Sequence, residues 1–298
     1  MHKPIIYKNN WNEKIEFGSR ALFISDTDLF NYSWQYDTDF GRIGNFRREI
    51  QERKMLISIY GKNEVEAYER ANKIFEVFEK DVLTQTPGKL WIGDYYLNCY
   101  IVEGSISKYY RQGNYLEKEL KIITDTPVWI KETAYIFYKE GLNPPDIGSR
   151  LFQRFSAASI IHYYYYGDED GNFSYPYGYP YGYYNNLVIK NIINEHFTDT
   201  NFELIIYGPV INPTVYIKGH PYTVYTELLD GEYLTINSTN KTVIKTKING
   251  EKVNEFNRRN KENSVFKLIE PGRNEISWDE EFSFGLILLD ERSEPKWT

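Results

Sequence analysis

The sequence predicts a mostly β protein with one long α-helix, folded as two domains. Three observations favour this fold class. Short β-prone runs separated by turn residues fill both halves of the chain. One helical repeat of apolar residues lies between residues 63 and 83. The length of 298 residues exceeds the usual size of a single domain.

Strands are predicted at the start of the chain. Residues 4–7 and 15–17 flank Asn9 and Asn10, a pair typical of a hairpin turn. Residues 54–60 form a near-continuous β-prone run that stops at Gly61. Later strands are predicted at residues 90–92, 95–102 and 115–123, and in the last of these apolar and charged residues alternate.

A helix is predicted from about Asn63 to Leu83. Asn63 can cap its first turn, and Glu64 and Glu66 lie where the helix dipole favours acidic side chains. Apolar residues recur at alternating spacings and predict one stripe that packs on a sheet, in preference to a coiled coil. That stripe consists of Tyr68, Ala71, Phe75, Phe78 and Val82.

The middle of the chain breaks the strand pattern. Residues 140–148 carry tandem prolines between glycines, which indicates a connection between domains. Residues 152–161 fit a short helix or a strand. Ten of the 28 tyrosines then fall between Tyr163 and Tyr184.

The second half is predicted as short strands with frequent turn signals, which is typical of a β-sandwich. Asp230-Gly231 and Asn249-Gly250 are two-residue hairpin signals, because both central positions of a type I′ turn need positive φ. The predicted strands are residues 202–207, 214–217, 222–227, 232–236, 242–248, 265–269, 275–278 and 282–289.

Composition excludes several classes of function. The net charge of −7 gives no basic surface for sequence-specific DNA binding. The single cysteine, Cys99, allows no disulfide within the chain and is predicted as a small buried side chain on a strand. No segment resembles a signal peptide or a membrane span, so a soluble protein made in the cytosol is expected.

The last residues carry the most specific signal. A charged tail ends in Trp297, and a tryptophan beside a terminus is predicted to pack on its own fold or on a neighbour. This ending resembles the distal tail protein (Dit) family of long-tailed bacteriophages. Similar stretches are residues 207–213, 230–236, 249–256 and 273–297, the tyrosine- and proline-rich run 175–181, and, in architecture, residues 57–61 with the helix that follows.

The resemblance implies a structural role at the tip of a phage tail. Dit proteins form a ring, typically a hexamer, between the tail tube protein above and the tail-associated lysin or fibre below. A belt domain builds the ring, and a galectin-like jelly-roll domain projects outward and can carry receptor-binding or baseplate proteins. DNA is expected to pass through the lumen without specific binding, and the implied location is the virion tail tip, after synthesis in the host cytoplasm.

The expected domains follow from this resemblance. Residues 1–140 are predicted as the belt domain, to which the tail 290–298 can be joined, since in some Dit members the final residues fold back. Residues 141–186 are predicted as a connection and residues 187–290 as the galectin-like β-sandwich. The residues predicted to form packing or interface contacts are Tyr175, Tyr177, Tyr179, Tyr181, Trp278 and Trp297.

No residue pattern predicts catalysis, a metal site or a cofactor. The four histidines are scattered, and Asp168-Glu169-Asp170-Gly171 lacks the later ligand of an EF-hand loop. Asp279, Glu280 and Glu281 could imitate a glycosidase carboxylate pair, but neighbouring side chains on a strand or turn mostly point apart. A hydrolase with unrecognised carboxylates is therefore kept as a hypothesis behind the structural hub and a carbohydrate-binding module.

The tyrosine-rich run supports two hypotheses. Its aromatic faces could stack on sugar rings, which would make the chain a carbohydrate-binding β-sandwich that recognises host cell-wall glycans. Proline at regular spacing instead favours an extended strap that packs on the sandwich or on a neighbouring subunit. The strap is the favoured interpretation, because tyrosine enrichment is general to interfaces.

Overall fold

The computed structural model describes residues 4–109, 114–139, 154, 160–164 and 190–296. The chain divides into unit 1 (Met1–Lys131 with Glu291–Thr298) and unit 2 (Glu132–Asp290). Two strands run from one unit into the other: β10 (Trp129–Phe137) and β22 (Phe284–Arg292). The domain borders predicted from the sequence lie near residues 140 and 290.

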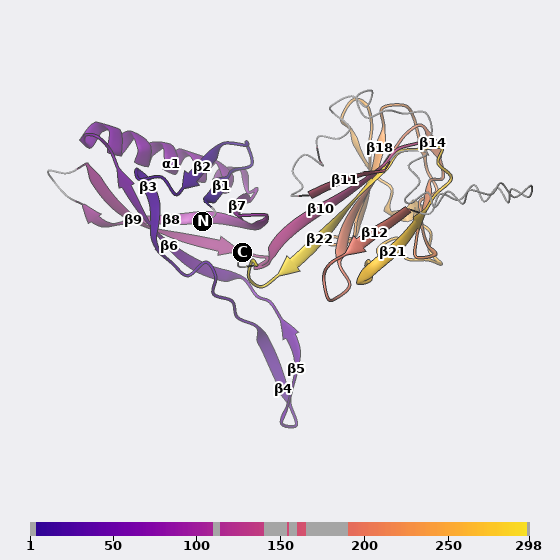
Figure 1. Cartoon of the computed structure of the whole chain (residues 1–298), viewed down its shortest axis with the longest axis horizontal. Helices are drawn as coiled ribbons and strands as arrows, with labels where there is room; N and C mark the ends of the chain where they lie inside the picture. The colour runs from indigo at the N-terminus through magenta and orange to yellow at the C-terminus, as the bar shows by residue number, and fades with distance from the viewer. Residues whose placement is uncertain (1–3, 110–113, 140–153, 155–159, 165–189, 297–298) are drawn as a thin grey trace, which may run out of the picture. The chain divides into compact units, whose positions relative to one another are not determined.

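Unit 1 is built from two sheets that share the long strand β8 (Figure 1). One sheet has the order β2-β1-β7-β8 and continues into the first residues of β10. The other has the order β3-β6-β9-β8. The strands are β1 (Ile5–Lys8), β2 (Lys14–Phe17), β3 (Leu22–Thr27), β6 (Gln51–Tyr60), β7 (Gly88–Ile92), β8 (Tyr95–Tyr109) and β9 (Tyr115–Thr124).

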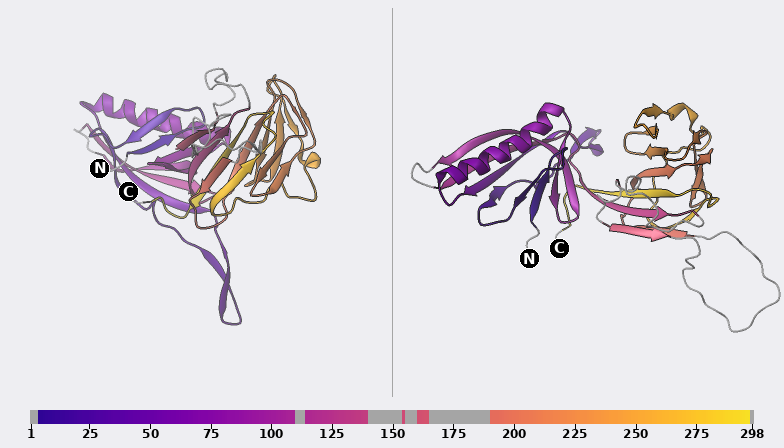
Figure 2. Two further views of the ribbon diagram at one scale, coloured as in Figure 1. Left: turned by 45° about the vertical axis from the view of Figure 1, so that its right-hand side comes forward. Right: turned by 90° about the horizontal axis from the view of Figure 1, so that it is seen from above.

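The helix α1 (Glu64–Thr84) covers unit 1, lying along its strands in Figure 2. It begins where the sequence predicted, because Asn63 accepts a hydrogen bond from the Glu66 amide at 2.9 Å. Gln85 ends the helix in a left-handed conformation with φ of 52°. The helix therefore ends by this backbone reversal, and Gly88 already begins strand β7.

The apolar stripe predicted for this helix was wrong at Tyr68, Phe75 and Val82, which are exposed, and right at the buried Phe78. The buried residues of α1 are Ala67, Ile74, Val77, Phe78 and Asp81, whereas Phe75 is 51% exposed. Apolar residues occupy a wide arc of this helix, and the sheet covers only one side of that arc. Residue spacing reports the arc but not the side on which the sheet lies.

Unit 2 is a β-sandwich. One sheet has the order β11-β10-β22-β13-β18-β19-β20, the other has the order β12-β21-β15-β16, and side chains from both form one core. Further strands and one 3-10 helix complete the unit: β11 (Ile160–Tyr164), β12 (Lys190–Asn194), β13 (Asn201–Tyr207), β14 (Val210–Ile211), β15 (Thr214–Ile217), β16 (His220–Thr223), β17 (Glu227–Leu228), β18 (Tyr233–Asn237), β19 (Thr242–Thr246), β20 (Lys252–Asn254), β21 (Gly272–Ser277) and η3 (Phe256–Arg258).

The predicted mostly β fold with one α-helix is confirmed over the described residues, with local corrections. Residues 265–269 are irregular, and only Ile269 makes a bridge, to Thr200. Residues 222–227 divide between two short strands, and residues 190–194 form a strand that was not predicted. The galectin-like form of the second domain stays a prediction.

The two hairpin signals had different outcomes. Asn249-Gly250 lies in the turn that joins the paired strands β19 and β20, as predicted, but only Gly250 has positive φ, at 84°, so the turn is not the expected type I′. Asp230-Gly231 also forms a turn, with Gly231 at φ of 77°. The strands on its two sides pair elsewhere, however, so this turn passes between sheets and closes no hairpin.

Candidate functional site

A two-stranded arm extends from unit 1 and is the most exposed ordered element of the described chain (Figure 1). It consists of β4 (Gln35–Asp39) and β5 (Arg42–Arg47), and every residue of the two strands is exposed except the half-buried Gly44. The strands pair only with each other. An isolated hairpin is marginally stable in water, so this arm is suited to be held by a partner.

The tip of the arm is a two-residue turn. Asp39 and Arg42 face each other across it, and Phe40 and Gly41 between them both have positive φ, at 45° and 73°. Glycine adopts such angles freely, while phenylalanine rarely does. The turn leaves the Phe40 ring 100% exposed.

Large apolar side chains follow the arm. Tyr36, Ile43 and Phe46 are each more than half exposed, and the rings of Tyr36 and Phe46 lie 6.3 Å apart. Exposed single apolar residues are common on protein surfaces, but a contiguous set of this kind usually marks an interaction site. The arm is therefore the candidate functional surface of unit 1.

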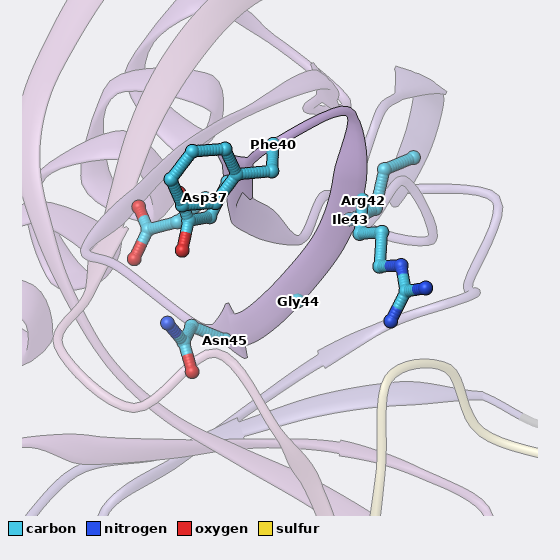
Figure 3. Close-up of a pocket in the computed structure, with 7 residues that line it drawn as sticks. Asp37, Phe40, Arg42, Ile43, Gly44 and Asn45 are labelled. Carbon is cyan, nitrogen blue, oxygen red and sulfur yellow. The ribbon is translucent and has the colours of Figure 1, made fainter.

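A hollow of about 470 Å³ lies on the arm, and Figure 3 shows the residues that line it. Both strands and the turn contribute to its lining, which combines apolar and charged side chains. Next to it, Arg47 binds the Asp37 carboxylate through two contacts of 2.9 and 3.0 Å, a surface ion pair that holds the two strands together. The lining residues are Asp37, Asp39, Phe40, Arg42, Ile43, Gly44 and Asn45.

The sheet β3-β6-β9-β8 offers two further interaction sites at its edges. Within the described residues, β3 pairs along its length with β6, and on its other side only Leu22 is bridged, to Ser19, so the edge is open beyond Leu22. Beyond Ile101, β8 pairs only with β9, so its outer backbone groups from Glu103 to Ser107 have no ladder partner there. Open strand edges are templates for pairing with another chain.

The residues singled out from sequence lie in very different places. Trp278 is 8% exposed in the core of unit 2, where its Nε1 donates to the Phe282 carbonyl at 3.1 Å. Tyr175, Tyr177, Tyr179, Tyr181 and Trp297 lie outside the described residues. The hypothesis of sugar binding depends on these tyrosines, so no described contact bears on it.

Sequence reasoning missed the arm. The available signal was a Phe-Gly pair between two runs in which polar and apolar residues alternate, a weaker form of the usual hairpin signature.

The ionisable groups buried in unit 2 form structural contacts. Glu132, 1% exposed, accepts from Arg154 at 2.8 Å, and Arg154 also contacts Glu203 at 3.2 Å. Burial would lower the pKa of Arg154, but the two carboxylates hold it above its ordinary value. Among the described residues, no group of three or more His, Cys, Asp and Glu side chains could hold a metal ion.

Cys99 lies on β8 with 1% of its surface exposed, as the sequence predicted. Burial raises the pKa of its thiol to about 12, which keeps it protonated and unreactive at neutral pH. In the described part of the chain, no helix is long and apolar enough to span a membrane.

Comparison with solved structures relates the fold to phage tails. A chain of the phage P2 baseplate in its activated conformation with Ca superposes with a TM-score of 0.57 and 12% identity, covering 99% of this chain and 100% of that one. The Dit protein of phage SPP1 superposes with a TM-score of 0.54 and 7% identity, covering 97% and 98%. The chain has the fold of a Dit protein.

The Dit fold was expected from the sequence, and the superpositions confirm it across both units. SPP1 Dit is a paradigm of the hub adsorption apparatus in phages that infect Gram-positive bacteria. No protein-family model and no curated protein matches the chain.

Proposed function

We propose that the chain is the structural hub of a phage tail tip. In this role, copies of the chain form a ring that joins the tail tube to the tail-associated lysin or fibre and to the receptor-binding apparatus. The observation that carries the proposal is the likeness to SPP1 Dit over 97% of this chain and 98% of that protein. A shared single domain would support much less, because one fold serves many functions.

The open edges of β3 and β8 support a ring in particular. They lie at opposite ends of one sheet order, β3-β6-β9-β8. If β3 of one copy pairs with β8 of the next, the contact joins two different surfaces and repeats around a closed ring. The arm can then reach an adjoining copy or a tail protein and bury its apolar side chains there.

The net charge of −7 is compatible with a lumen through which DNA slides, because an acidic chain offers phosphates no general attraction. The ring itself is tested by light scattering and negative-stain microscopy of the purified chain, alone and with the tail tube protein of the same phage. We expect an annular particle of several copies. A monomer that stays monomeric at high concentration and is not recruited by the tube protein would refute the proposal.

Two matched substitutions test the part played by the arm. Phe40→Asp places a charge on the fully exposed tip of the arm, and Phe197→Asp places one on a ring of unit 2 that is 77% exposed. Neither should change the melting temperature. We expect only Phe40→Asp to weaken assembly, and equal assembly of the two variants would remove the arm from the interface.

A further inference from the structure

An exposed apolar side chain lies at the open edge of β8, on the side of the sheet that α1 covers. Along β8, Gly104 lies opposite Leu120 of β9, and Ile106 lies opposite Lys118. Residues that face each other in an antiparallel pair point to the same side of the sheet. Leu120 belongs to the core under α1, so Ile106 also points to the helix side, where it is 62% exposed.

The side chain of Lys118 reaches across β8 towards this edge. A Cβ built on Gly104 would lie 2.6 Å from Lys118 Cε and 3.2 Å from its Nζ, so the lysine fills the space that a side chain at Gly104 would take. The ammonium lies 5.6 Å from the centre of the Phe75 ring of α1, and Phe75 is 51% exposed. Phe75, Ile106 and Lys118 therefore form one group, the β8 edge cluster.

The charge in this cluster is not balanced within the described residues. Lys118 is half-buried, and no carboxylate there forms an ion pair with it. Burial lowers the pKa of Lys118, and no neighbouring charge opposes this effect. An exposed ring, an exposed isoleucine and an unbalanced cation beside an open strand edge are features of a surface that another chain covers.

The opposite edge of the same sheet carries a matching side chain. Ile24 of β3 lies opposite Ile57 of β6, and Ile57 belongs to the core under α1. Ile24 therefore points to the helix side as well. It packs on that core but is only partly buried, because the outer side of β3 is open there.

Strand direction favours joining these two edges. Each neighbouring pair in the order β3-β6-β9-β8 is antiparallel, so β3 and β8 run in opposite directions. Rotation about a ring axis changes neither the direction of β3 along that axis nor the side of the sheet that carries α1. The β3 strand of the next copy would therefore pair with β8 antiparallel, and its Ile24 would lie on the same side as Ile106.

We propose that the β8 edge cluster is one half of the contact between copies, and that Ile24 of the next copy packs on Phe75 and Ile106. This inference rests on the proposed ring and adds α1 to its contact surface. Residues 22–28 carry two aspartates and no basic residue, so they bring the charge that Lys118 lacks. Backbone pairing, apolar burial and opposite charge together select this edge over others.

A cross-link between copies tests the contact directly. In the variant Ile24→Cys/Ile106→Cys, a short bis-maleimide added during assembly should join each copy to the next and give a ladder of covalent multiples on a denaturing gel. The reagent is longer than one residue of a strand, so a small shift in register does not hide the contact. Cys99 is buried and protonated and should not react. Each single variant, and Ile24→Cys/Val65→Cys, should give no ladder.

Val65 supplies the matched control, because nine residues, about two and a half turns, separate it from the buried Ile74. It is 64% exposed and points away from the sheet. Phe75→Asp should raise the concentration needed for half assembly about tenfold or more, as expected for an apolar residue at an interface centre. Val65→Asp should leave that concentration unchanged, and both variants should keep the wild-type melting temperature. This comparison decides the question if Ile24→Cys prevents folding.

Three results would overturn this contact and leave the proposed ring standing. The first is a ring, seen by microscopy, in which Ile24→Cys/Ile106→Cys is not cross-linked. The second is equal assembly of Phe75→Asp and Val65→Asp. The third is a Phe75→Asp ring that assembles normally but no longer binds the tail tube protein, which would assign the cluster to that protein. A wild-type chain that forms no ring would refute the proposed function itself, and this contact with it.

Discussion

Removing the Tyr7 hydroxyl should destabilise unit 1 through the buried carboxylate of Asp81. Both residues are 0% exposed. The Tyr7 hydroxyl donates to Asp81 Oδ2 at 2.6 Å, and the Asn10 amide donates to Asp81 Oδ1 at 2.9 Å. These two bonds tie strand β1 and the turn after it to the last turns of α1, so Tyr7→Phe tests whether this contact holds the helix on its sheet.

The size of the effect follows from the charge on the acceptor. A hydrogen bond to a charged group contributes about 1.5–3 kcal/mol, more than a bond between neutral groups. Phenylalanine keeps the ring of Tyr7 and its edge contact with Phe78, so no large cavity opens. For a unit of this size the loss corresponds to a fall in melting temperature of about 3–12 °C.

The effect should depend on pH with a defined sign. Burial raises the pKa of Asp81 above its ordinary value, while the bonds from Asn10 and Tyr7 lower it. A raised pKa in the folded state means that the stability which Asp81 contributes is complete below its ordinary pKa and is lost as pH rises through the raised value. Tyr7→Phe removes one lowering contact and raises that pKa further. The variant should therefore lose more stability at about pH 7 than at about pH 4.

Urea unfolding across this pH range measures the effect, and hydrogen exchange of peptides from α1 assigns it to unit 1. Tyr68→Phe is the matched control, because the Tyr68 hydroxyl donates at 2.8 Å to Glu64 on the exposed side of the same helix. That variant should lose less than about 0.5 kcal/mol. Equal losses for the two variants, or a loss for Tyr7→Phe that is the same at both pH values, would refute the reasoning.

Five other substitutions have expected outcomes. Gly88→Ala places a Cβ 2.3 Å from the Tyr7 hydroxyl and should lower the free energy of unfolding by about 1–3 kcal/mol. The Cβ of Gly44→Ala meets nothing within 4 Å, so this variant should keep the wild-type melting temperature. Phe78→Ala should lower the free energy of unfolding in urea by about 3–5 kcal/mol and Phe75→Ala by much less. Equal losses would restore the predicted stripe, which contains both residues. Arg154→Met leaves two carboxylates together and should cost about 3–5 kcal/mol at neutral pH, with partial recovery in acid, as read by melting temperature.

The sequence predicted those elements whose signal is local. The Asn63 cap, the hairpin after β1 and the Asn249-Gly250 turn each depend on a few neighbouring residues, and each lies where the pattern indicated. Whether a segment forms a helix or a strand also follows from the spacing of its apolar residues, which is a local signal. These features depend on residues close together in the chain, so a single sequence is sufficient to find them.

Tertiary context decided what the sequence could not. Asp81 and Arg53 have charged side chains, which are normally exposed, yet both are buried because distant segments supply their partners. The arm shows the reverse: its apolar side chains Phe40 and Phe46 are exposed, although their residue type alone predicts burial in a core. No pattern within one chain shows which apolar side chains are left exposed on the folded surface.

The low identity to the neighbours, 7% and 12%, limits which interface contacts can be carried over from them. A core tolerates many substitutions when volume and pattern are kept, so the fold survives such divergence. Contacts between side chains across an interface do not survive it, because each depends on particular residues. Pairing between strand edges uses backbone N–H and C=O groups, which every sequence with this fold supplies. Ring closure through β3 and β8 is therefore the part of the proposed assembly that the fold itself supports, while the partners of the arm must be identified from the exposed side chains of this chain.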